Sequence, residues 1–572
     1  MPLSLSTLTP TPYKNKNGWR AVINLLLLST LSSGLLITDD FIQQLFISTN
    51  HAELEWNFVA AVWLFSLALW LCHWPRLSTT LLSAFALMEL VQLGHISFFG
   101  EPLSAIGLKG LFDDFAEVRQ TGVHSFFDHW HVLPSVLVPY GLLITLHLLL
   151  PHRIALPRNR WALLIIILVL GGKPYRASYR GFQAFTPGPT RSALHNSFNA
   201  FSYYAVRLAL RDETTIEASF KPYQLTPQAS QTHHLWLVIP DSLRTDHLNL
   251  FGYERDTMPR LNTLAQRGQL IAKPGIASGV STLVSLSNLI NLVSSPGQTQ
   301  LLTQQPYNLF SIAKANGFNT LWLSSQESKL LAYLGKRAID TAITRETHPL
   351  LFAQKHDFAL VDLLAQQAWP ARHFAVINLR SAHLPYAENY SQYPQPLPWN
   401  DQLPDRKERQ INAYDNSLRY LDDVLSEIIN AFERLDGERY LIITGDHGQL
   451  LGEQESWGHN VLKPEVIEVP VLIVARNAPE SALEEIRTKR WVSHYEIATW
   501  IAARLGTRVE NPNWHEGRHF VQGTLPFGDT PLREVETTPT GLTYKPAQLL
   551  SQWLRETEAK SVTPSPARTQ QP

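Results

Sequence analysis

Two side chains that could bind a metal stand together just after a short apolar run. Tyr440–Thr444 has the composition of a β-strand, Gly445 interrupts it, and Asp446 and His447 follow. In an open α/β sheet, loops beyond the carboxyl ends of strands are the usual place for catalytic groups. A carboxylate oxygen beside an imidazole nitrogen suits a divalent cation such as zinc. This stretch is therefore our first candidate for an active site.

Two neighbours strengthen this interpretation, and one alternative competes with it. Gly448 would let the backbone come close to whatever the cation holds. His459, further along the same loop, could reach an anion bound there. The alternative is an ordinary turn with a solvated Asp446 and with His447 capping the next helix, so the pair alone does not establish catalysis.

The elements that must position these groups begin at His234, where apolar β-runs alternate with helical stretches. Tyr307–Ala315 and Gln410–Phe432 are the clearest helical stretches. The alternation predicts an α/β domain with a central sheet flanked by helices on both faces. The other predicted strands are Leu235–Ile239, Asn319–Ser324, His373–Asn378 and Val469–Val474.

Candidate ligands and a candidate nucleophile follow other elements of this predicted sheet. Asp241 follows one strand and His383 another. Gly275–Asn288 is a glycine-bearing turn that feeds a helix, and the free N–H groups of a helix N-terminus suit a hydroxyl attacking an anionic centre. The hydroxyls available in this turn are Ser278, Ser281 and Thr282.

Composition excludes some functions. The chain has 572 residues, and 48 Lys and Arg against 49 Asp and Glu leave a net charge of −1. No overall positive field recruits nucleic acid, so we expect no nucleic-acid partner. Cys72 is the single cysteine and lies in an apolar segment, so no disulfide can form within the chain.

Long uncharged runs predict a transmembrane domain over residues 1–172. Lys and Arg residues precede the first run and separate the second from the third and the fourth from the fifth, so these sides face the cytoplasm. Everything from about Lys173 onward is then extracytoplasmic. A cleaved signal peptide is the alternative for the first run, but four more follow it. The five predicted helices are 21–38, 58–74, 77–98, 132–150 and 156–172.

The remaining segments complete the predicted domain organisation. Residues 107–122 place apolar side chains on one helical face, which predicts an amphipathic helix at the membrane surface or against the α/β domain. Residues 173–232 are predicted to connect the membrane domain to a periplasmic catalytic domain at 233–559. Residues 560–572 are rich in Pro and Ser and are predicted to be disordered.

Five motifs carry a resemblance to a known family, namely VIPDSLRTDHLNLFGYERDTMPRL (238–261), SGVSTLVSLSN (278–288), SAHLPY (381–386), NAYDNSLRYLDDVL (412–425) and GDHGQLLGE followed by SWGHN. Together they resemble the membrane-bound phosphoethanolamine transferases of the alkaline phosphatase and sulfatase superfamily. The resemblance implies a multi-pass enzyme of the bacterial inner membrane with its catalytic domain in the periplasm. It also implies transfer of phosphoethanolamine from phosphatidylethanolamine to lipid A, lipopolysaccharide core or another envelope glycan.

The same resemblance implies roles for individual residues. Thr282 matches the nucleophilic threonine, which forms a phospho-threonine intermediate and binds the catalytic Zn²⁺. The other residues matched to this family are the zinc ligands Asp241, Asp446 and His447, the substrate-side histidines His383 and His459, and the substrate-binding residues Glu117 and Lys329.

The chain departs from the family pattern at two places. The first zinc ligand is usually glutamate, whereas Asp241 is one methylene shorter. Where the family has Pro-Cys after the nucleophile, this chain has Ser287–Asn288, so Ser281 stays an alternative nucleophile. Whether a second metal binds is open.

Three other activities compete with this one. A sulfatase would need Cys or Ser followed by Pro and Arg, and Ser281–Leu286 has neither Pro nor Arg. A phosphoglycerol transferase would share the zinc site and the five spans and differ only in the donor headgroup. A non-catalytic lipid-binding regulator would be free to lose its metal ligands, which this chain keeps. The acceptor cannot be named from the sequence.

Overall fold

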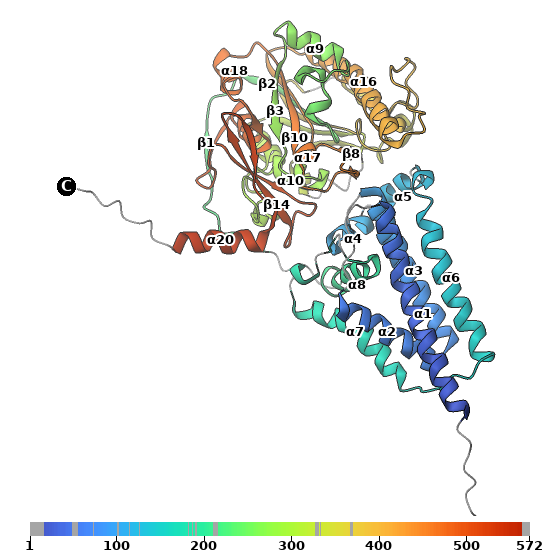
Figure 1. Cartoon of the computed structure of the whole chain (residues 1–572). Helices are drawn as coiled ribbons and strands as arrows, with labels where there is room; N and C mark the ends of the chain where they lie inside the picture. The colour runs from blue at the N-terminus through green and yellow to red at the C-terminus, as the bar shows by residue number, and fades with distance from the viewer. Residues whose placement is uncertain are drawn as a thin grey trace, which may run out of the picture. The chain divides into compact units, whose positions relative to one another are not determined.

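The protein divides into a helical unit, Met1–Asp212, and an α/β unit, Glu213–Pro572. Figure 1 shows the ribbon of both units. The computed structural model describes residues 16–47, 55–72, 74–99, 102–113, 115–124, 126–180, 182–185, 187–188, 191–209, 216–326, 331, 333–366 and 370–562.

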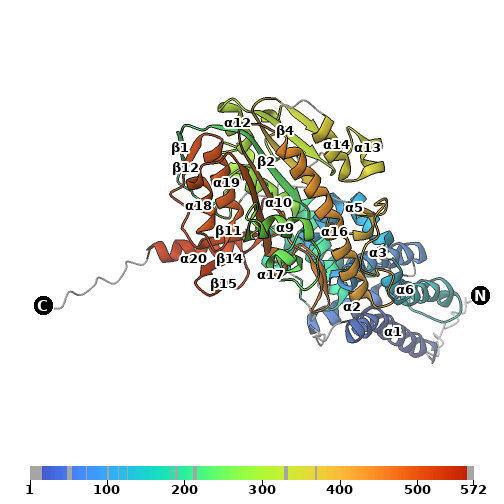
Figure 2. The same ribbon diagram turned by 90° about the horizontal axis from the view of Figure 1, so that it is seen from above.

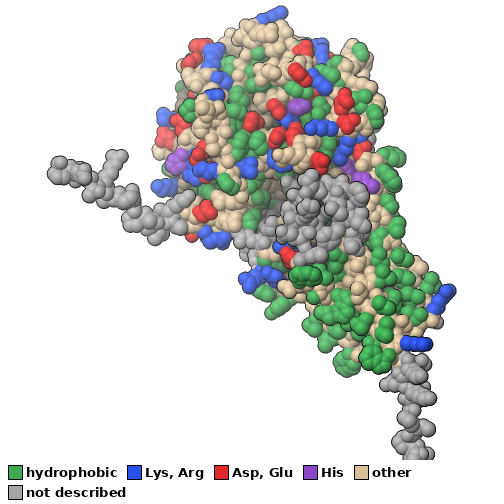
Figure 3. All heavy atoms as spheres, in the orientation of Figure 1, with side chains coloured by type: hydrophobic (Ala, Val, Ile, Leu, Met, Phe, Trp, Pro, Cys, Tyr) green, Lys and Arg blue, Asp and Glu red, His purple; other side chains and the backbone are tan. Residues whose placement is uncertain are grey.

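The helical unit contains the apolar helices expected from the sequence. Four of them are long and apolar enough to cross a membrane, over Gly18–Ile37, Pro75–Phe99, Val132–Leu149 and Ala162–Tyr179, whereas α2 is apolar but has 17 residues. On the face shown in Figure 3, hydrophobic side chains dominate this unit and charged ones are spread over the α/β unit. Five membrane spans therefore remain a prediction. The five helices are α1 (Lys16–Ile47), α2 (Trp56–Cys72), α3 (Pro75–Phe99), α6 (Val132–Leu149) and α7 (Ala162–Tyr179).

The fifth helix differs from its expected bounds of 156–172. It begins at Ala162 and runs past Gly172 into the expected connector. This extension packs on α8 (Ala193–Tyr203), where Lys173 Nζ donates to Asn199 Oδ1 at 2.7 Å. Contact with α8 is a physical reason for α7 to continue past Gly172. The apolar pattern of the α7 sequence alone does not reveal this contact.

The expected amphipathic helix at 107–122 consists of two helices in the structure. They are α4 (Ala105–Asp113) and α5 (Phe115–His124). Leu108 of α4 is buried, whereas Phe112 and Phe115 are exposed. The apolar face predicted for one helix is therefore divided between two.

A mixed eight-stranded sheet organises the α/β unit within the described residues. Its order is β11-β3-β10-β7-β2-β6-β4-β5, with β7, β2, β6, β4 and β5 parallel and β10 antiparallel to both of its neighbours. All five strands predicted from the sequence are present. The strands of the sheet are β2 (Thr232–Pro240), β3 (Ile271–Ile276), β4 (Asn319–Ser324), β5 (Thr341–Ile343), β6 (His373–Leu379), β7 (Glu438–Thr444), β10 (Glu468–Arg476) and β11 (Val492–Ser493).

Alternate residues of each strand enter two apolar cores, one on each face of the sheet. On β2, Leu235 and Leu237 belong to one core, and Trp236 and Val238 belong to the other. Figure 2 shows α18 and α19 on one side of the sheet and α14 and α16 on the other. The predicted sheet covered on both faces is confirmed. The helices are α9 (Pro259–Gln266), α10 (Thr282–Ile290), α11 (Thr299–Thr303), α12 (Leu309–Ala315), α13 (Pro349–Lys355), α14 (Phe358–Gln366), α15 (Tyr386–Asn389), α16 (Arg406–Glu433), α17 (Pro464–Ile467), α18 (Glu480–Arg487) and α19 (His494–Arg504).

A smaller sheet follows toward the C-terminus and supports the hydroxyl turn. Val280 N donates to the carbonyl of Gln522, and Gln522 N donates to the carbonyl of Ser278, both at 3.1 Å. Helix α20 (Leu550–Val562) ends the described chain, and most of the predicted disordered tail lies outside the described residues. The remaining strands are β1 (Gln224–Pro227), β8 (Leu450–Glu453), β9 (Ser456–Gly458), β12 (Thr507–Glu510), β13 (Arg518–Gln522), β14 (Pro531–Thr538), β15 (Gly541–Tyr544) and β16 (Gln548–Leu549).

Candidate metal centre and active site

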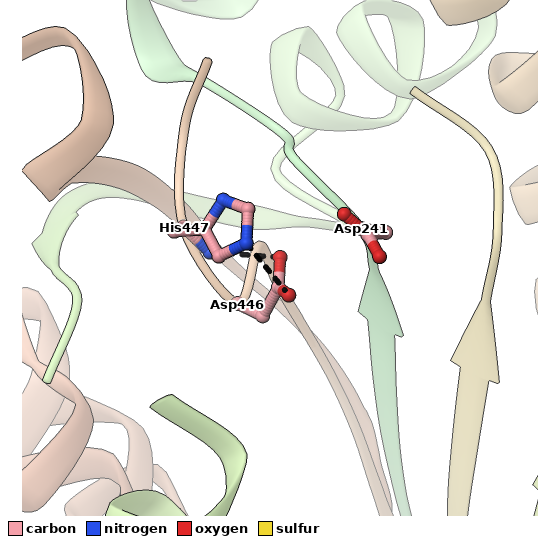
Figure 4. A group of neighbouring side chains, drawn as sticks. All are labelled: Asp241, Asp446 and His447. Atoms are coloured by element: carbon pink, nitrogen blue, oxygen red, sulfur yellow. Dashed lines mark hydrogen bonds and ion pairs between the residues drawn. The ribbon is translucent and has the colours of Figure 1, made fainter. Parts of the chain in front are cut away.

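Three predicted ligands meet at the carboxyl edge of the large sheet. Strand β2 lies between β7 and β6 and is parallel to both, so the loops that follow these strands emerge at one edge. Asp241, Asp446 and His447 are buried, and each offers one ligand atom within 4.8 Å of the others. Figure 4 shows Asp241 at the end of β2 and the other two side chains on the loop after β7.

The structure places Thr282 at this cluster and directs Ser281 elsewhere. Thr282 is the first residue of α10, and its Oγ1 lies 3.4 Å from Asp241 Oδ2 and 3.3 Å from His447 Nε2. Ser281 Oγ instead donates to the carbonyl of Thr524 at 3.2 Å. The threonine hydroxyl, and not the serine hydroxyl, therefore contacts the candidate ligands.

Hydrogen bonds orient each ligand. His447 Nδ1 lies 2.9 Å from the Gly448 carbonyl, and a proton on Nδ1 makes Nε2, which faces Thr282 and Asp446, the ligand atom. Oδ1 of Asp446 accepts from the backbone N–H groups of Ser242 at 2.9 Å and of His447 at 2.8 Å. Asp241 Oδ1 accepts from the Ser242 hydroxyl at 2.7 Å.

Two glycines of the Asp446 loop are required by close backbone contacts. A Cβ atom on Gly448 would lie 2.1 Å from the carbonyl oxygen of Glu465, and one on Gly445 would lie 2.5 Å from that of Leu243. The contact with Glu465 is a second reason for a glycine at position 448, and the expected one, room for a group held by the cation, stays a prediction. The glycine admits the segment that leads into β10.

His383 and His459 lie beside the cluster. The ring of His459 stacks on that of His447 with centroids 4.3 Å apart, and the centroids of His383 and His459 are 6.2 Å apart. His459 Nδ1 lies 3.2 Å from the Val280 carbonyl, so Nε2 is the nitrogen left to face a substrate. The structure thus brings together six of the eight predicted site residues.

Burial and charge act differently on the two carboxylates. Burial, followed by the charge of Asp241, raises the pKa of Asp446 to about 7. For Asp241, burial alone would raise the pKa, but His383, His447 and the Ser242 hydroxyl together lower it. Burial first, and then the neighbouring histidines, lower the pKa of His459 to about 4. Two carboxylates in one buried place repel each other, which a bound cation would relieve.

The residues present fit a divalent cation. Oδ2 of Asp446 is buried and lies 3.4 Å from His447 Nε2, and among the described residues no group makes a hydrogen bond of standard geometry to it. A buried carboxylate oxygen left in this state is costly unless an ion or a proton meets it. Two carboxylates, an imidazole nitrogen and a hydroxyl form a donor set that zinc accepts.

Two other predicted residues are not placed at this site. Lys329 lies outside the described residues. Glu117 lies within α5 of the helical unit, and only its backbone is described.

Two contributors to the site were not predicted. Gln326 Nε2 donates to Asp241 Oδ2 at 2.9 Å and to the Leu379 carbonyl at 3.1 Å. It follows the predicted strand Asn319–Ser324 by two residues, and this strand end was a signal that could have found it. His494 is buried beneath the site, with Nε2 at 3.0 Å from the Gly445 carbonyl and Nδ1 at 3.2 Å from Ser285 Oγ. No local signal marks His494.

Comparisons with known proteins agree with this architecture. Residues 233–507 match the Sulfatase family. The protein named YhbX from Escherichia coli (strain K12) is 25% identical over 321 residues, which cover 54% of this chain and 56% of that protein. The Kdo(2)-lipid A phosphoethanolamine 7''-transferase of the same strain is 25% identical over 264 residues, 43% of this chain and 45% of that protein. The chain thus spans about half the length of the curated relatives it matches.

The solved structure of the integral membrane protein lipooligosaccharide phosphoethanolamine transferase A (EptA) from Neisseria meningitidis shows the same fold. It aligns with a TM-score of 0.54 and 17% identity over 85% of this chain and 96% of that chain. An alignment over 85% of the chain extends beyond the α/β unit, Glu213–Pro572, into the helical unit. Residues 233–507 of this chain therefore match the Sulfatase family in sequence, within a chain that shares the fold of this solved transferase.

Proposed function

We propose that the protein transfers phosphoethanolamine from phosphatidylethanolamine to a cell-envelope glycolipid or glycan, such as lipid A or lipopolysaccharide core. The observation that carries the proposal is the position of Thr282 Oγ1, within 3.4 Å of Asp241 and His447 at the first residue of α10. Relatives named phosphoethanolamine transferases support the choice of transferred group.

Asp241, Asp446 and His447, together with Thr282, would hold the cation, for which zinc suits the donor set. Bound there, zinc would lower the pKa of the threonine hydroxyl and so supply a nucleophile at neutral pH.

The first half-reaction uses the side chains of the site and the end of α10. Thr282 gives its proton to solvent and its Oγ1 attacks the donor phosphorus, so that a new P–O bond forms and the bond from phosphorus to the diacylglycerol oxygen breaks. His383 gives a proton to that leaving oxygen. The free N–H groups at the N-terminus of α10 stabilise negative charge on the phosphoryl oxygens. The product is a phosphoethanolamine ester of Thr282.

The second half-reaction returns the enzyme to its starting state. Neutral His459, with Nδ1 directed at the Val280 carbonyl, takes a proton at Nε2 from the acceptor hydroxyl. The acceptor oxygen then attacks phosphorus and the bond to Thr282 breaks. The threonine oxygen takes back a proton from solvent, and the proton on His459 passes through solvent to His383, which restores both histidines. This is a ping-pong arrangement.

The proposed location is the bacterial inner membrane, with several helices crossing it and the α/β unit in the periplasm. A phosphoglycerol transferase with the same site is the second candidate, because none of these contacts distinguishes the two headgroups. A non-catalytic lipid-binding regulator is the third, and the retained ligand cluster argues against it.

The deciding experiment incubates the full-length protein with phosphatidylethanolamine and no acceptor. Mass spectrometry should find a phosphoethanolamine adduct on the peptide that contains Thr282, because the first half-reaction does not need the second substrate. Thr282→Ala should abolish the adduct, and Ser281→Ala should keep it. An adduct that forms only with phosphatidylglycerol would favour the phosphoglycerol transferase, and no adduct with either lipid would favour the regulator.

A further inference from the structure

A buried carboxylate outside the metal cluster holds the loop that carries His383. Asp357 lies between α13 and α14 and is 2% exposed. Its Oδ1 accepts from Ser325 Oγ at 2.5 Å and from Arg380 N at 3.1 Å. Its Oδ2 accepts from Ser381 N at 2.8 Å and also from the Ser381 hydroxyl. All four donors belong to the two loops that follow β4 and β6.

The loop after β6 contains a strained turn. His383 N donates to the Arg380 carbonyl at 3.1 Å, which closes a turn over Arg380–His383. Ala382, the third residue of this turn, has φ 78° and is fully buried. A turn of this kind normally places glycine or asparagine there, because a side chain at positive φ costs roughly 1–3 kcal/mol. Such a conformation persists only when the surrounding structure enforces it.

Asp357 is placed to enforce it. The carboxylate takes the backbone N–H groups of Arg380 and Ser381, the two residues that precede Ala382 in the turn. These two bonds fix the direction in which the chain enters the left-handed position. His383 follows Ala382 in the chain, so the direction of the His383 side chain depends on the same two hydrogen bonds.

We propose that Asp357 is a positioning residue, which acts by holding the Arg380–His383 turn so that His383 faces the reacting phosphoryl group. The inference rests on the proposed function in one respect, the role given to His383. It assigns a task to a buried carboxylate that makes no contact with Thr282 or with the metal ligands in the described structure.

Asp357→Asn is the first test. The substitution replaces one acceptor oxygen by an NH₂ group that faces N–H and O–H donors, so the turn should relax. In full-length protein, the rate of adduct formation on Thr282 should fall on the order of tenfold to a hundredfold, the cost of misplacing a catalytic group by about 1 Å. Ala382→Gly added to this variant should recover part of the rate, because glycine adopts φ 78° without strain.

A double-mutant cycle separates positioning from general destabilisation. If Asp357 acts through His383, Asp357→Asn should cause no further loss in a His383→Ala background. The matched control is Asp415→Asn. Asp415 is also a fully buried carboxylate, but it accepts from His247, Tyr253 and Arg255, away from the turn. Its effect should be the same in both backgrounds, and an additive loss for Asp357→Asn would overturn the proposal.

A structure of the Asp357→Asn variant decides the matter independently of activity. Ala382 should leave positive φ, or the His383 ring should be displaced. If the turn and the ring keep their positions, the positioning role of Asp357 is wrong even when the rate falls. If His383→Ala alone leaves the adduct rate unchanged, the proposed role of His383 fails, and this structure still decides whether Asp357 holds the turn.

Discussion

Arg244, which is buried, and Glu453, which is partly exposed, form an ion pair that joins the loops bearing the candidate metal ligands. Arg244 Nη1 lies 2.7 Å from Glu453 Oε1, and the arginine side chain is 3% exposed. The same nitrogen donates to the Gln449 carbonyl at 2.8 Å. Arg244 follows Asp241 by three residues, and Glu453 closes the GDHGQLLGE segment that carries Asp446 and His447. The last glutamate of that motif thus ties one ligand loop to the other.

Removal of this link should loosen the metal centre. In Glu453→Ala, Arg244 keeps Asp246 and the Gln449 carbonyl but loses its ion pair with the Asp446 loop, so zinc affinity should fall about tenfold, as for other residues that orient ligands. Competition with a chelator measures this on full-length protein. Glu510→Ala, at an exposed pair with Arg508, is the control and should leave affinity unchanged. Equal affinity in all three proteins would contradict the link.

The zinc content of the protein should depend strongly on Asp446 and His447 and only weakly on Thr282. Purified full-length protein should carry about one zinc per chain. Asp446→Ala and His447→Ala should each lose most of it, whereas Thr282→Ala should retain most of it because three ligands remain. Elemental analysis after gel filtration checks this. Zinc retained at full stoichiometry in both variants would contradict the assignment of Asp446 and His447 as zinc ligands.

Gln326 should matter for the rate because it orients Asp241. Gln326→Leu keeps a similar volume but removes the donor to Asp241 Oδ2. We expect adduct formation to slow by about tenfold, with the unfolding temperature within a few degrees of the parent. Gln392→Leu serves as the control, because it removes an amide that donates to the Ala353 carbonyl in an exposed hydrogen bond. A parental rate in Gln326→Leu would show that Asp241 needs no such support.

The pair of buried histidines His234 and His373 should make the α/β unit sensitive to acid. Burial first, and then His373, lower the pKa of His234 from 6.5 to about 4. The folded state therefore keeps His234 neutral where the unfolded chain takes up a proton. Its contribution to stability is full above pH 6.5 and is lost as pH falls toward 4, with an upper limit of roughly 3 kcal/mol.

Thermal unfolding of His234→Gln at several pH values tests this. The loss of stability relative to the parent should be larger at neutral pH than near pH 5, because the parent loses the contribution that the variant lacks. His515→Gln, at an exposed position, should show no such trend. A difference that does not vary with pH would contradict the burial of neutral His234.

The orientation of the chain can be tested with fusions. A reporter that is active only outside the cytoplasm should be active after Phe220 and silent near Pro157, because the Arg153–Arg160 loop is expected on the cytoplasmic side. The reverse pattern would place the α/β unit in the cytoplasm and exclude an outer-leaflet lipid donor.

The sequence by itself determined the strands and several ligands, since these are local properties. An apolar run followed by a polar residue marks a strand end wherever it occurs, and parallel strands bring such ends to one edge. Asp241, Asp446 and His447 could be proposed for this reason. The sequence also determined that the N-terminal third is apolar enough for membrane helices.

Only the tertiary structure decided the contacts between distant segments. The choice between Ser281 and Thr282 depends on Thr524, which takes the serine hydroxyl, and the need for Gly448 depends on the carbonyl of Glu465. Gln326 reaches Asp241 only because β4 and β2 flank β6. These hydrogen bonds and close approaches join residues far apart in the chain, and no periodicity or spacing in the sequence encodes a partner that only folding brings into contact.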